Sequence, residues 1–363
     1  MIADVVRVLD ERGGQLGLPR LRPGVVIGID ADPAGKVTML LVDDDGRPRA
    51  VAKVGRRPGA DGHRLTDEHE ALVRVHRHAL PRAGHTVPQP LLLERVAGRL
   101  VLVTSVLHGA PLSVRYYRPG HVSSESRVRA DFAAAAEWLA AFQSDTGLQT
   151  VSCAEAWHTQ LMPLFVRYRA TVGWSEWEAN LYERLLRWVD DFGSVSVQLG
   201  SVHGDYCIGN VLLDGTAVSG VVDWELGREP ALAVTDVFKF AASYGSFLDR
   251  AASARRDGLA GHARWADVRK RWGIRSAWPN LTGFVYAFQG AGWFPELVRD
   301  YLAANYRRMG CPAEVQPLFL IGFVAEQVLI LDNPIYRQGY RDLLHALADM
   351  YDDYRPISAA VTR

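Results

Sequence analysis

A predicted hairpin near the middle of the chain carries polar side chains at both of its ends. Its strands are two apolar runs, at 211–213 and 218–222, and the Asp-Gly pair between them favours a tight turn. Because a hairpin returns the chain to its starting point, we expect Asn210 and Asp223 to lie side by side, with Asp205 at the mouth of the same loop. Carboxylate and carboxamide oxygens suit Mg²⁺, and a further carboxylate can orient or deprotonate a hydroxyl. The stretch therefore favours phosphoryl transfer, which depends on positioning and charge neutralisation.

The spacing of these residues also resembles a known family. His-Gly-Asp-x4-Asn, from His203 to Asn210, precedes the hairpin, and Asp-Trp-Glu begins at Asp223. This pattern is similar to that of the aminoglycoside phosphotransferase and choline kinase family, which shares the architecture of the eukaryotic protein kinases. The resemblance implies that Asp205 is catalytic, that Asn210 and Asp223 bind Mg²⁺, and that His203 supports the backbone of the loop. The alternative is a polar hairpin in an ordinary β-rich domain.

Lys53, which precedes the motif, is notable because lysine is rare in this chain. The chain contains four lysines, so nearly every other cation is arginine, and Lys53 lies inside the short apolar strand expected at 49–54. Such a lysine either extends outward to solvent or pairs with a buried anion. A compact ammonium group also suits phosphate. The resemblance implies that Lys53 holds the α- and β-phosphates of a nucleotide.

The partner of this lysine should be a glutamate on the next helix, expected at 65–80. Glu68 and Glu70 are the candidates, and Glu70 fits the family's usual position better. The alternative for Glu70 is a place on a solvated helix face. The strand at 99–107 then runs into a break typical of a hinge between lobes. There the resemblance implies that adenine binds the carbonyl of Ser105 and the amide of Leu107, although an edge strand could simply end at a loop.

Patterning along the chain predicts strands followed mainly by helices, and the resemblance implies an α+β fold with two lobes, like that of the protein kinases. Residues 1–107 form a β-rich nucleotide-binding lobe with an antiparallel sheet, its helix and a lead-in helix within 1–24. Residues 108–363 form a larger, mainly helical lobe that carries the catalytic loop and the acceptor pocket, because the periodicity becomes helical from about residue 124. Thr235 begins one of its helices, with Asp236 able to cap that helix and brace the catalytic loop. The remaining sheet strands are expected at 25–30, 37–42 and 87–95, and the main helices of the second lobe at 126–146, within 153–193, and at 296–309, 318–331 and 338–354.

Composition excludes several classes of function. The net charge is zero, with 41 basic and 41 acidic residues, so no basic surface for nucleic acid is expected. The longest apolar run, at 319–325, is shorter than a membrane span, and charge near the first residue argues against an export signal. Three cysteines suit a reducing cytoplasm. We therefore expect a cytoplasmic protein that binds neither nucleic acid nor membrane, and the sequence leaves the oligomeric state open.

The leading hypothesis is an ATP- and Mg²⁺-dependent phosphotransferase whose acceptor is a hydroxyl of a small molecule, either an antibiotic or a metabolite. The alternatives are a kinase acting on Ser or Thr of a peptide and a catalytically inactive nucleotide-binding scaffold. The chain shows no acidic excess for a polycationic aminoglycoside, while Arg and Trp cluster at 167–177 and 255–272. This composition favours a neutral or anionic acceptor with an apolar or ring portion. For each residue alone, surface Arg and core Trp is the simpler interpretation.

Overall fold

The chain divides into two compact units. The computed structural model describes residues 2–16, 18–29, 35–56, 63–252, 262, 282–330 and 334–350. One unit, here called the sheet unit, comprises Met1–Ala110, His203–Asp205 and Asn210–Arg228, and the other, the helical unit, comprises Pro111–Val202, Tyr206–Gly209 and Glu229–Arg363. The division falls three residues after the lobe boundary that we predicted at 107. The ends of the predicted catalytic loop and its hairpin group with the sheet unit, whereas we had placed them in the second lobe.

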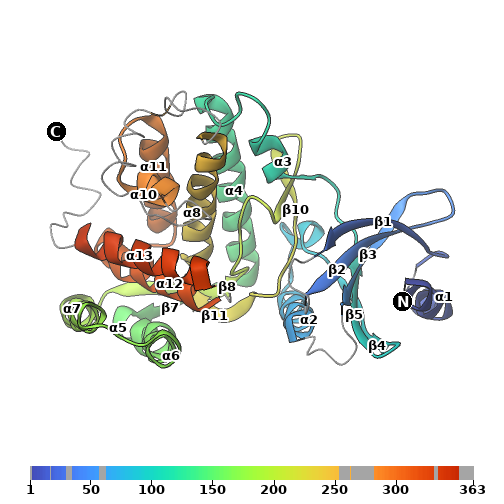
Figure 1. Ribbon diagram of the computed structural model, residues 1–363, viewed down its shortest axis with the longest axis horizontal. Helices are drawn as coiled ribbons and strands as arrows, with labels where there is room; N and C mark the ends of the chain where they lie inside the picture. The colour runs from blue at the N-terminus through green and yellow to red at the C-terminus, as the bar shows by residue number, and fades with distance from the viewer. Residues whose placement is uncertain are drawn as a thin grey trace. The chain divides into compact units, whose positions relative to one another are not determined.

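The sheet unit is built on a five-stranded antiparallel sheet in the order β1-β2-β3-β5-β4 (Figure 1). Its elements are α1 (Ile2–Leu16), β1 (Arg22–Ile29), β2 (Lys36–Val42), β3 (Pro48–Gly55), α2 (His63–Val75), η1 (Gly84–Thr86), β4 (Pro90–Val96), β5 (Arg99–Ser105) and the separate hairpin of β9 (Val211–Asp214) and β10 (Ala217–Val221), which a short strand, β6 (Ala110–Pro111), extends. The lead-in helix and all the predicted strands are present. The helix predicted at 65–80 ends earlier, at Val75, where the chain enters turns.

Helices α1 and α2 cover opposite faces of this sheet (Figure 1). Side chains alternate along a strand, so Ala52 and Val54 of β3 face one side and Lys53 the other. Val5 of α1 joins the apolar core formed by Ala52, Val54 and their neighbours. Lys53 instead meets Glu68 of α2. The alternation thus places a single lysine beneath α2.

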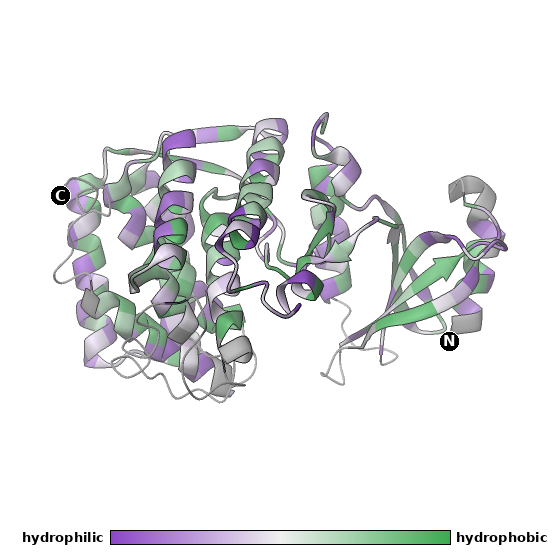
Figure 2. Cartoon of the chain, turned by 90° about the horizontal axis from the view of Figure 1, so that it is seen from above, coloured by the Kyte–Doolittle hydropathy of each residue, from purple (hydrophilic) through white to green (hydrophobic). Residues whose placement is uncertain are grey.

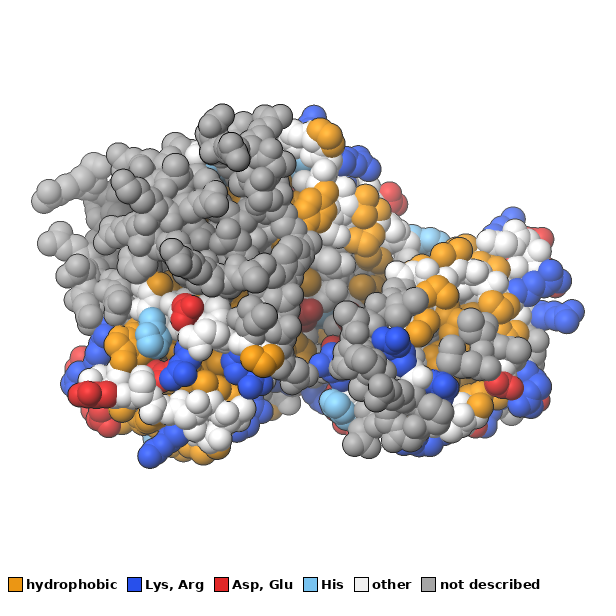
Figure 3. Space-filling model, viewed as in Figure 1, with side chains coloured by type: hydrophobic (Ala, Val, Ile, Leu, Met, Phe, Trp, Pro, Cys, Tyr) orange, Lys and Arg blue, Asp and Glu red, His pale blue; other side chains and the backbone are white. Residues whose placement is uncertain are grey.

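Strand β1 is an edge of the sheet and leaves apolar side chains exposed. Val25, Val26 and Ile27 are all well exposed, and Figure 3 shows apolar side chains gathered over this unit. The register of β1 against β2 shifts twice between Pro23 and Gly28. Irregular pairing of this kind limits further strand addition at an edge.

The helical unit contains long helices with apolar residues on part of their circumference and hydrophilic residues on the rest (Figure 2). Its elements are α3 (Leu112–Tyr116), α4 (Glu125–Thr146), β7 (Leu148–Ser152), α5 (Cys153–Ala156), a π-helical turn (Trp157–Leu161), α6 (Met162–Val172), α7 (Glu176–Phe192), β8 (Ser196–Val202), β11 (Arg228–Leu232, whose first residue groups with the sheet unit), α8 (Thr235–Ala252), α10 (Thr282–Gln289), α11 (Trp293–Arg308), a 3₁₀ turn (Ala313–Val315), α12 (Gln316–Ile330) and α13 (Pro334–Met350). The predicted helices are present with shifted ends. The small sheet β11-β8-β7 was not predicted.

One stretch among the described helices, Ala313–Ile330, has the length and hydropathy of a membrane span, which our reading of the sequence did not anticipate. Buried positions make up 72% of it. A buried core helix of a soluble protein passes the same test, so this is weak evidence for a membrane span. The helix packs against α13 and α6.

Candidate functional site

His203 fixes the backbone of the loop that precedes the hairpin. Its Nδ1 accepts the backbone N–H of Asp205 at 3.2 Å, so the ring proton resides on Nε2, which donates to the carbonyl of Val222 at 3.0 Å. The ring is fully buried against Trp224. Gly204 has φ +79°, and a Cβ there would lie 2.3 Å from the carbonyl oxygen of Leu226. Only glycine therefore fits this turn, and one imidazole ties the loop to the end of β10.

Asn210 holds the carboxylate of Asp205. Its Nδ2 donates to Oδ2 of Asp205 at 2.8 Å and to the Asp205 carbonyl at 3.0 Å. The first bond orients the carboxylate, the second holds the loop backbone, and both direct the carboxamide oxygen of Asn210 away from Asp205. Asp205 is partly exposed, as a group that must reach a substrate should be.

The hairpin brings Asn210 and Asp223 together, as the sequence predicted. Strands β9 and β10 pair from Val211 with Val221, and the carbonyl of Asn210 accepts the N–H of Val222 at 2.9 Å. Asp223 follows with φ +70°, a left-handed backbone that is uncommon outside glycine and often marks a functional position.

Asp223 carries two lysine contacts on one carboxylate oxygen. Nζ of Lys53 lies 2.9 Å and Nζ of Lys36 2.5 Å from Oδ1. Burial alone would raise the pKa of Asp223, but the two ammonium groups hold that pKa below its usual range. Asp223 is therefore a stable carboxylate in the folded protein.

The glutamate that pairs with Lys53 is Glu68, and our prediction of Glu70 is wrong. Oε1 of Glu68 lies 2.5 Å from Nζ of Lys53, and Glu68 is buried. Glu70 is exposed, because two residues along a helix correspond to a rotation of about 200°. The signal was present in the sequence, since Glu68 lies three residues after Leu65 and four before Leu72 on the apolar stripe of α2.

Lys36 and Glu225 belong to the same cluster, although we assigned neither a role from the sequence. Nζ of Lys36 lies 2.5 Å from Oε2 of Glu225 as well as from Asp223, and Arg64 approaches Oε1 of Glu225 at 3.7 Å. Burial would lower the pKa of Lys36, but the carboxylates outweigh it and raise that pKa. The pKa of Glu225 is raised by burial and by the charge of Asp223. The scarcity of lysine was the signal that could have identified Lys36.

The donor set fits a hard cation. Asp205, Asn210 and Asp223 offer oxygen atoms around the base of one hairpin, which is the ligand chemistry of Mg²⁺. Within the described ranges, no group of three or more His, Cys, Asp or Glu side chains is arranged to hold a metal ion. A metal at this position would therefore depend on the Asn210 carboxamide, and on oxygen from substrate and water.

Three other residues received a predicted role from the sequence: Ser105, Leu107 and Asp236. Ser105 ends β5, where its N–H donates to the carbonyl of Gln89 at 2.9 Å. Leu107 follows in the connection to β6, so the adenine contacts proposed for these two residues stay predictions. Asp236 is buried in the first turn of α8 within the helical unit, where acidic residues favour the helix N-terminus. Its predicted bracing of the catalytic loop also stays a prediction.

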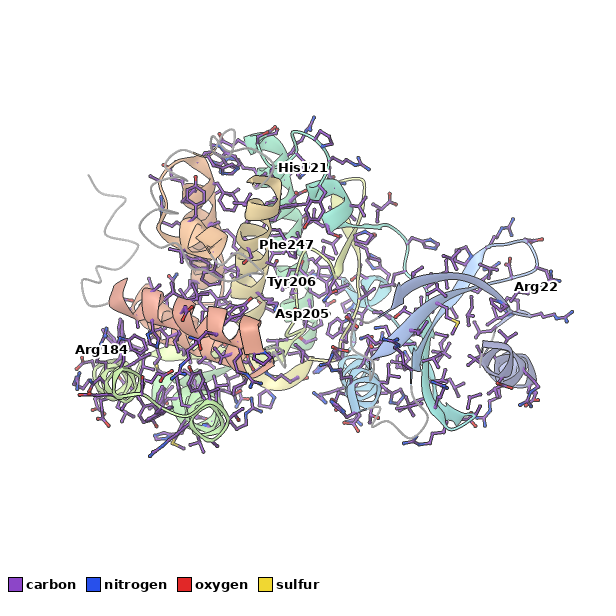
Figure 4. The ribbon with its side chains drawn as sticks, in the orientation of Figure 1. Arg22, His121, Arg184, Asp205, Tyr206 and Phe247 are labelled. Carbon is purple, nitrogen blue, oxygen red and sulfur yellow. The ribbon has the colours of Figure 1, made fainter. Side chains whose placement is uncertain are left out.

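The middle of the predicted catalytic loop is anchored in the helical unit. Tyr206, labelled in Figure 4, is fully buried there, with its ring stacked on Trp138 at 5.0 Å between centroids. Its hydroxyl donates to the carbonyl of Ala135 at 3.2 Å. Burial, followed by the charges of Tyr301 and Asp236, raises the pKa of Tyr206 well above its usual value. Tyr206 thus anchors the middle of the loop in the helical unit.

Tryptophans of the first Arg- and Trp-rich segment, 167–177, pack on an arginine of the segment and on a histidine of α13. The guanidinium of Arg169 lies 5.1 Å from the ring centroid of Trp174, and Trp177 stacks on His345. These contacts support the simpler reading of surface arginine and packed tryptophan. The second segment, 255–272, lies outside the described residues, apart from residue 262, and so does most of the Arg-rich interval 250–275.

Comparison with known proteins identifies what this chain is similar to. A model of the phosphotransferase enzyme family matches residues 34–269, which include the cluster described above. No curated protein sequence matches the chain.

Three solved structures illustrate the matches to this chain. One is a thermostable mutant of aminoglycoside phosphotransferase APH(4)-Ia in a ternary complex with AMP-PNP and hygromycin B, with a TM-score of 0.53, 16% identity, and coverage of 97% of this chain and 100% of that chain. The second is a macrolide 2'-phosphotransferase from Brachybacterium faecium, with a TM-score of 0.45, 15% identity and coverage of 98% of each chain. The third is a streptomycin–ATP–APH(2'')-IIa ternary complex, with a TM-score of 0.40, 14% identity and coverage of 80% and 95%. The first likeness confirms the predicted α+β, protein-kinase-like fold.

Proposed function

The chain belongs to the phosphotransferase enzyme family, and from this premise we propose that it transfers the γ-phosphoryl group of ATP to a hydroxyl of a small molecule in the presence of Mg²⁺. One observation supports the proposal above all others. Lys53 bridges Glu68 and Asp223, while Asn210, beside Asp223, holds the carboxylate of Asp205. A phosphate-binding cation, a metal-binding carboxylate and a base thus converge around one hairpin.

Each residue of the site has its own role in the proposed phosphoryl transfer. Asp205 accepts the proton of the acceptor hydroxyl, and the hydrogen bond from Asn210 to its Oδ2 keeps the carboxylate oriented for this step. Lys53, held by Glu68, binds phosphate oxygens of ATP. Asn210 and Asp223 would hold Mg²⁺, which when bound neutralises charge on the phosphates.

The acceptor is proposed from composition and from similarity in fold. The similar aminoglycoside phosphotransferase was solved with AMP-PNP and hygromycin B, a nucleotide analogue with a small molecule. This chain, with 41 basic and 41 acidic residues, lacks the acidic excess that a polycationic acceptor favours. We therefore propose a neutral or anionic small molecule as the acceptor.

A coupled assay of ADP release tests both parts of the proposal. The purified protein is screened with ATP and Mg²⁺ against aminoglycosides, nucleoside antibiotics, sugars, amino alcohols and Ser/Thr peptides. We expect acceptor-dependent ADP release with a small molecule, and its loss in Asp205→Ala. Turnover confined to kanamycin or streptomycin would refute the acceptor class alone. Turnover confined to peptides, or ADP release equal in the Asp205→Ala protein, would refute the function.

A further inference from the structure

The ammonium group of Lys36 lies between the carboxylate of Asp223, a proposed metal ligand, and that of Glu225. It is 2.5 Å from Oδ1 of Asp223 and 2.5 Å from Oε2 of Glu225. The Lys36 side chain is 12% exposed, against 32% for Asp223 and 18% for Glu225. The ammonium group of Lys36 thus occupies a position between two carboxylate oxygens where a metal cation could also bind.

The ion pairs around Asp223 match acidic and basic side chains in equal number. The ion pairs join the carboxylates of Glu68, Asp223 and Glu225 to three basic side chains, those of Lys36, Lys53 and Arg64. A divalent cation added at Asp223 would give the cluster an excess of positive charge close to two ammonium groups. Like charges at such short range repel strongly where water is scarce. Departure of one ammonium group from Asp223 would relieve this repulsion when a metal binds there.

The two lysines differ in how firmly they are held. Lys53 lies within β3, and its second partner, Glu68, is a buried residue of α2. Lys36 is the first residue of β2, and its second partner, Glu225, lies two residues after Asp223 in the chain that leaves the hairpin. Displacing Lys53 would leave a buried carboxylate without its cation, which costs more than displacing Lys36. Of the two lysines, Lys36 is therefore the one that a metal ion at Asp223 would displace more easily.

We propose that Lys36 is a built-in competitor of the metal, an ammonium group that occupies the cation position at Asp223 and Glu225 until a divalent ion displaces it. This inference rests on the proposed function, which places the metal at Asp223. It adds a residue that sets the affinity of the site for the divalent ion and is itself neither base nor metal ligand. Its consequence is that the protein binds metal more weakly than its oxygen donors alone would allow.

The test measures metal binding directly, with Mn²⁺ as the probe and electron paramagnetic resonance of free Mn²⁺ as the readout. The full-length protein is titrated with and without AMP-PNP. Lys36→Met should tighten the Mn²⁺ dissociation constant by about tenfold, because the competing charge is gone. Lys36→Arg, which keeps the charge, should stay near the wild-type value. Lys239→Met is the matched control, because Lys239 bonds Gln327 in the helical unit and should leave Mn²⁺ binding unchanged.

Thermal unfolding gives a second readout. Without metal, Lys36→Met should unfold at a lower temperature than the wild type, because two carboxylates have lost a shared cation. Mn²⁺ should then raise its unfolding temperature more than that of the wild type. Lys36→Gln, which removes the charge but keeps a polar side chain, serves as the second variant if Lys36→Met fails to fold.

The outcomes separate this inference from the proposed function. Wild-type protein that binds neither Mn²⁺ nor AMP-PNP would overturn both. Wild-type binding of Mn²⁺ with AMP-PNP, together with an unchanged or weaker Mn²⁺ affinity in the charge-removing Lys36 variants, would overturn only the competition. An equal tightening in Lys239→Met would also overturn it, because the effect would then reflect net charge alone.

Discussion

The Nζ atom of Lys53 lies 2.9 Å from Oδ1 of Asp223, although 170 residues separate the two in the chain. Strand alternation turns Lys53 toward α2, and the left-handed backbone at Asp223 turns its carboxylate toward Lys53 after β10 ends. Neither residue would be stable there alone, because a buried charge without a partner is costly. The pair therefore links strand β3, for which we propose phosphate binding through Lys53, to the proposed metal site within one compact unit.

The first prediction separates the two glutamates of α2. Glu68→Gln should raise the KM for ATP by roughly tenfold or more, because Lys53 loses its buried anionic partner and is less well positioned for phosphate. Glu70→Gln removes the same charge from an exposed position on the same helix and should change the KM by less than about twofold. Steady-state kinetics at saturating acceptor checks both. A larger effect from Glu70→Gln would restore Glu70 as the functional residue.

The second prediction concerns Asp205. Asp205→Asn keeps the size of the side chain and can still contact Asn210, but it cannot accept a proton. Turnover should fall by about 10²- to 10⁴-fold, while the affinity for AMP-PNP measured by calorimetry stays within a few-fold of the wild type. A parallel loss of nucleotide affinity would show that Asp205 serves binding instead of catalysis.

The third prediction concerns the metal dependence of nucleotide binding. In the wild type, AMP-PNP should bind more tightly with Mg²⁺ than with EDTA, because the metal joins the phosphates to Asp223. In Asp223→Asn this difference should disappear, since a neutral amide binds Mg²⁺ poorly. The comparison needs only binding titrations in the two buffers. A retained Mg²⁺ effect in the variant would remove Asp223 from the metal site.

Much of the fold could be predicted from local patterns. The hairpin followed from an Asp-Gly turn between apolar runs, and its pairing brought Asn210 and Asp223 together as expected. The strand containing Lys53 and the helix that begins at Thr235 followed in the same way. These features depend on residues close together in sequence, where periodicity and turn chemistry act directly.

The features that could not be predicted from the sequence depend on contacts between distant segments. Glu68 is buried because Lys53 lies beneath its face of α2 and pairs with it. Helix periodicity places Glu68 on the apolar face, but it does not determine which glutamate pairs with the lysine. Lys36 meets Asp223 and Glu225 across almost 190 residues, so no local pattern reveals it. The strand β8 and its short partners were missed because their stability comes from tertiary packing and not from a strong alternation of side chains.

The last prediction tests an ion pair that stabilises the helical unit. Glu178 of α7 accepts two hydrogen bonds from Arg341 of α13, each of 2.5 Å, and one from the hydroxyl of Tyr168 at 2.9 Å. It also completes a capping box with Ser175 at the start of α7. Burial would raise the pKa of Glu178, but these donors outweigh it and lower that pKa to about 2. Glu178 is therefore ionised in the folded protein near neutral pH.

The sign of the pH dependence follows from this lowered pKa. A carboxyl group that titrates lower in the folded state stabilises fully above its unfolded pKa of about 4.3 and loses that stabilisation as the pH falls toward about 2. The free energy of unfolding should thus decline between about pH 5 and pH 2, in part through Glu178.

The Glu178→Gln variant should lose roughly 3 kcal/mol of unfolding free energy at pH 7, because Arg341 keeps a partly buried charge without its partner. Its unfolding free energy should also decline less steeply below pH 5. Urea unfolding followed by circular dichroism at several pH values measures both effects. Glu176→Gln, an exposed change in the same turn of α7, is the control and should behave like the wild type; equal curves for the two variants would contradict the role of Glu178.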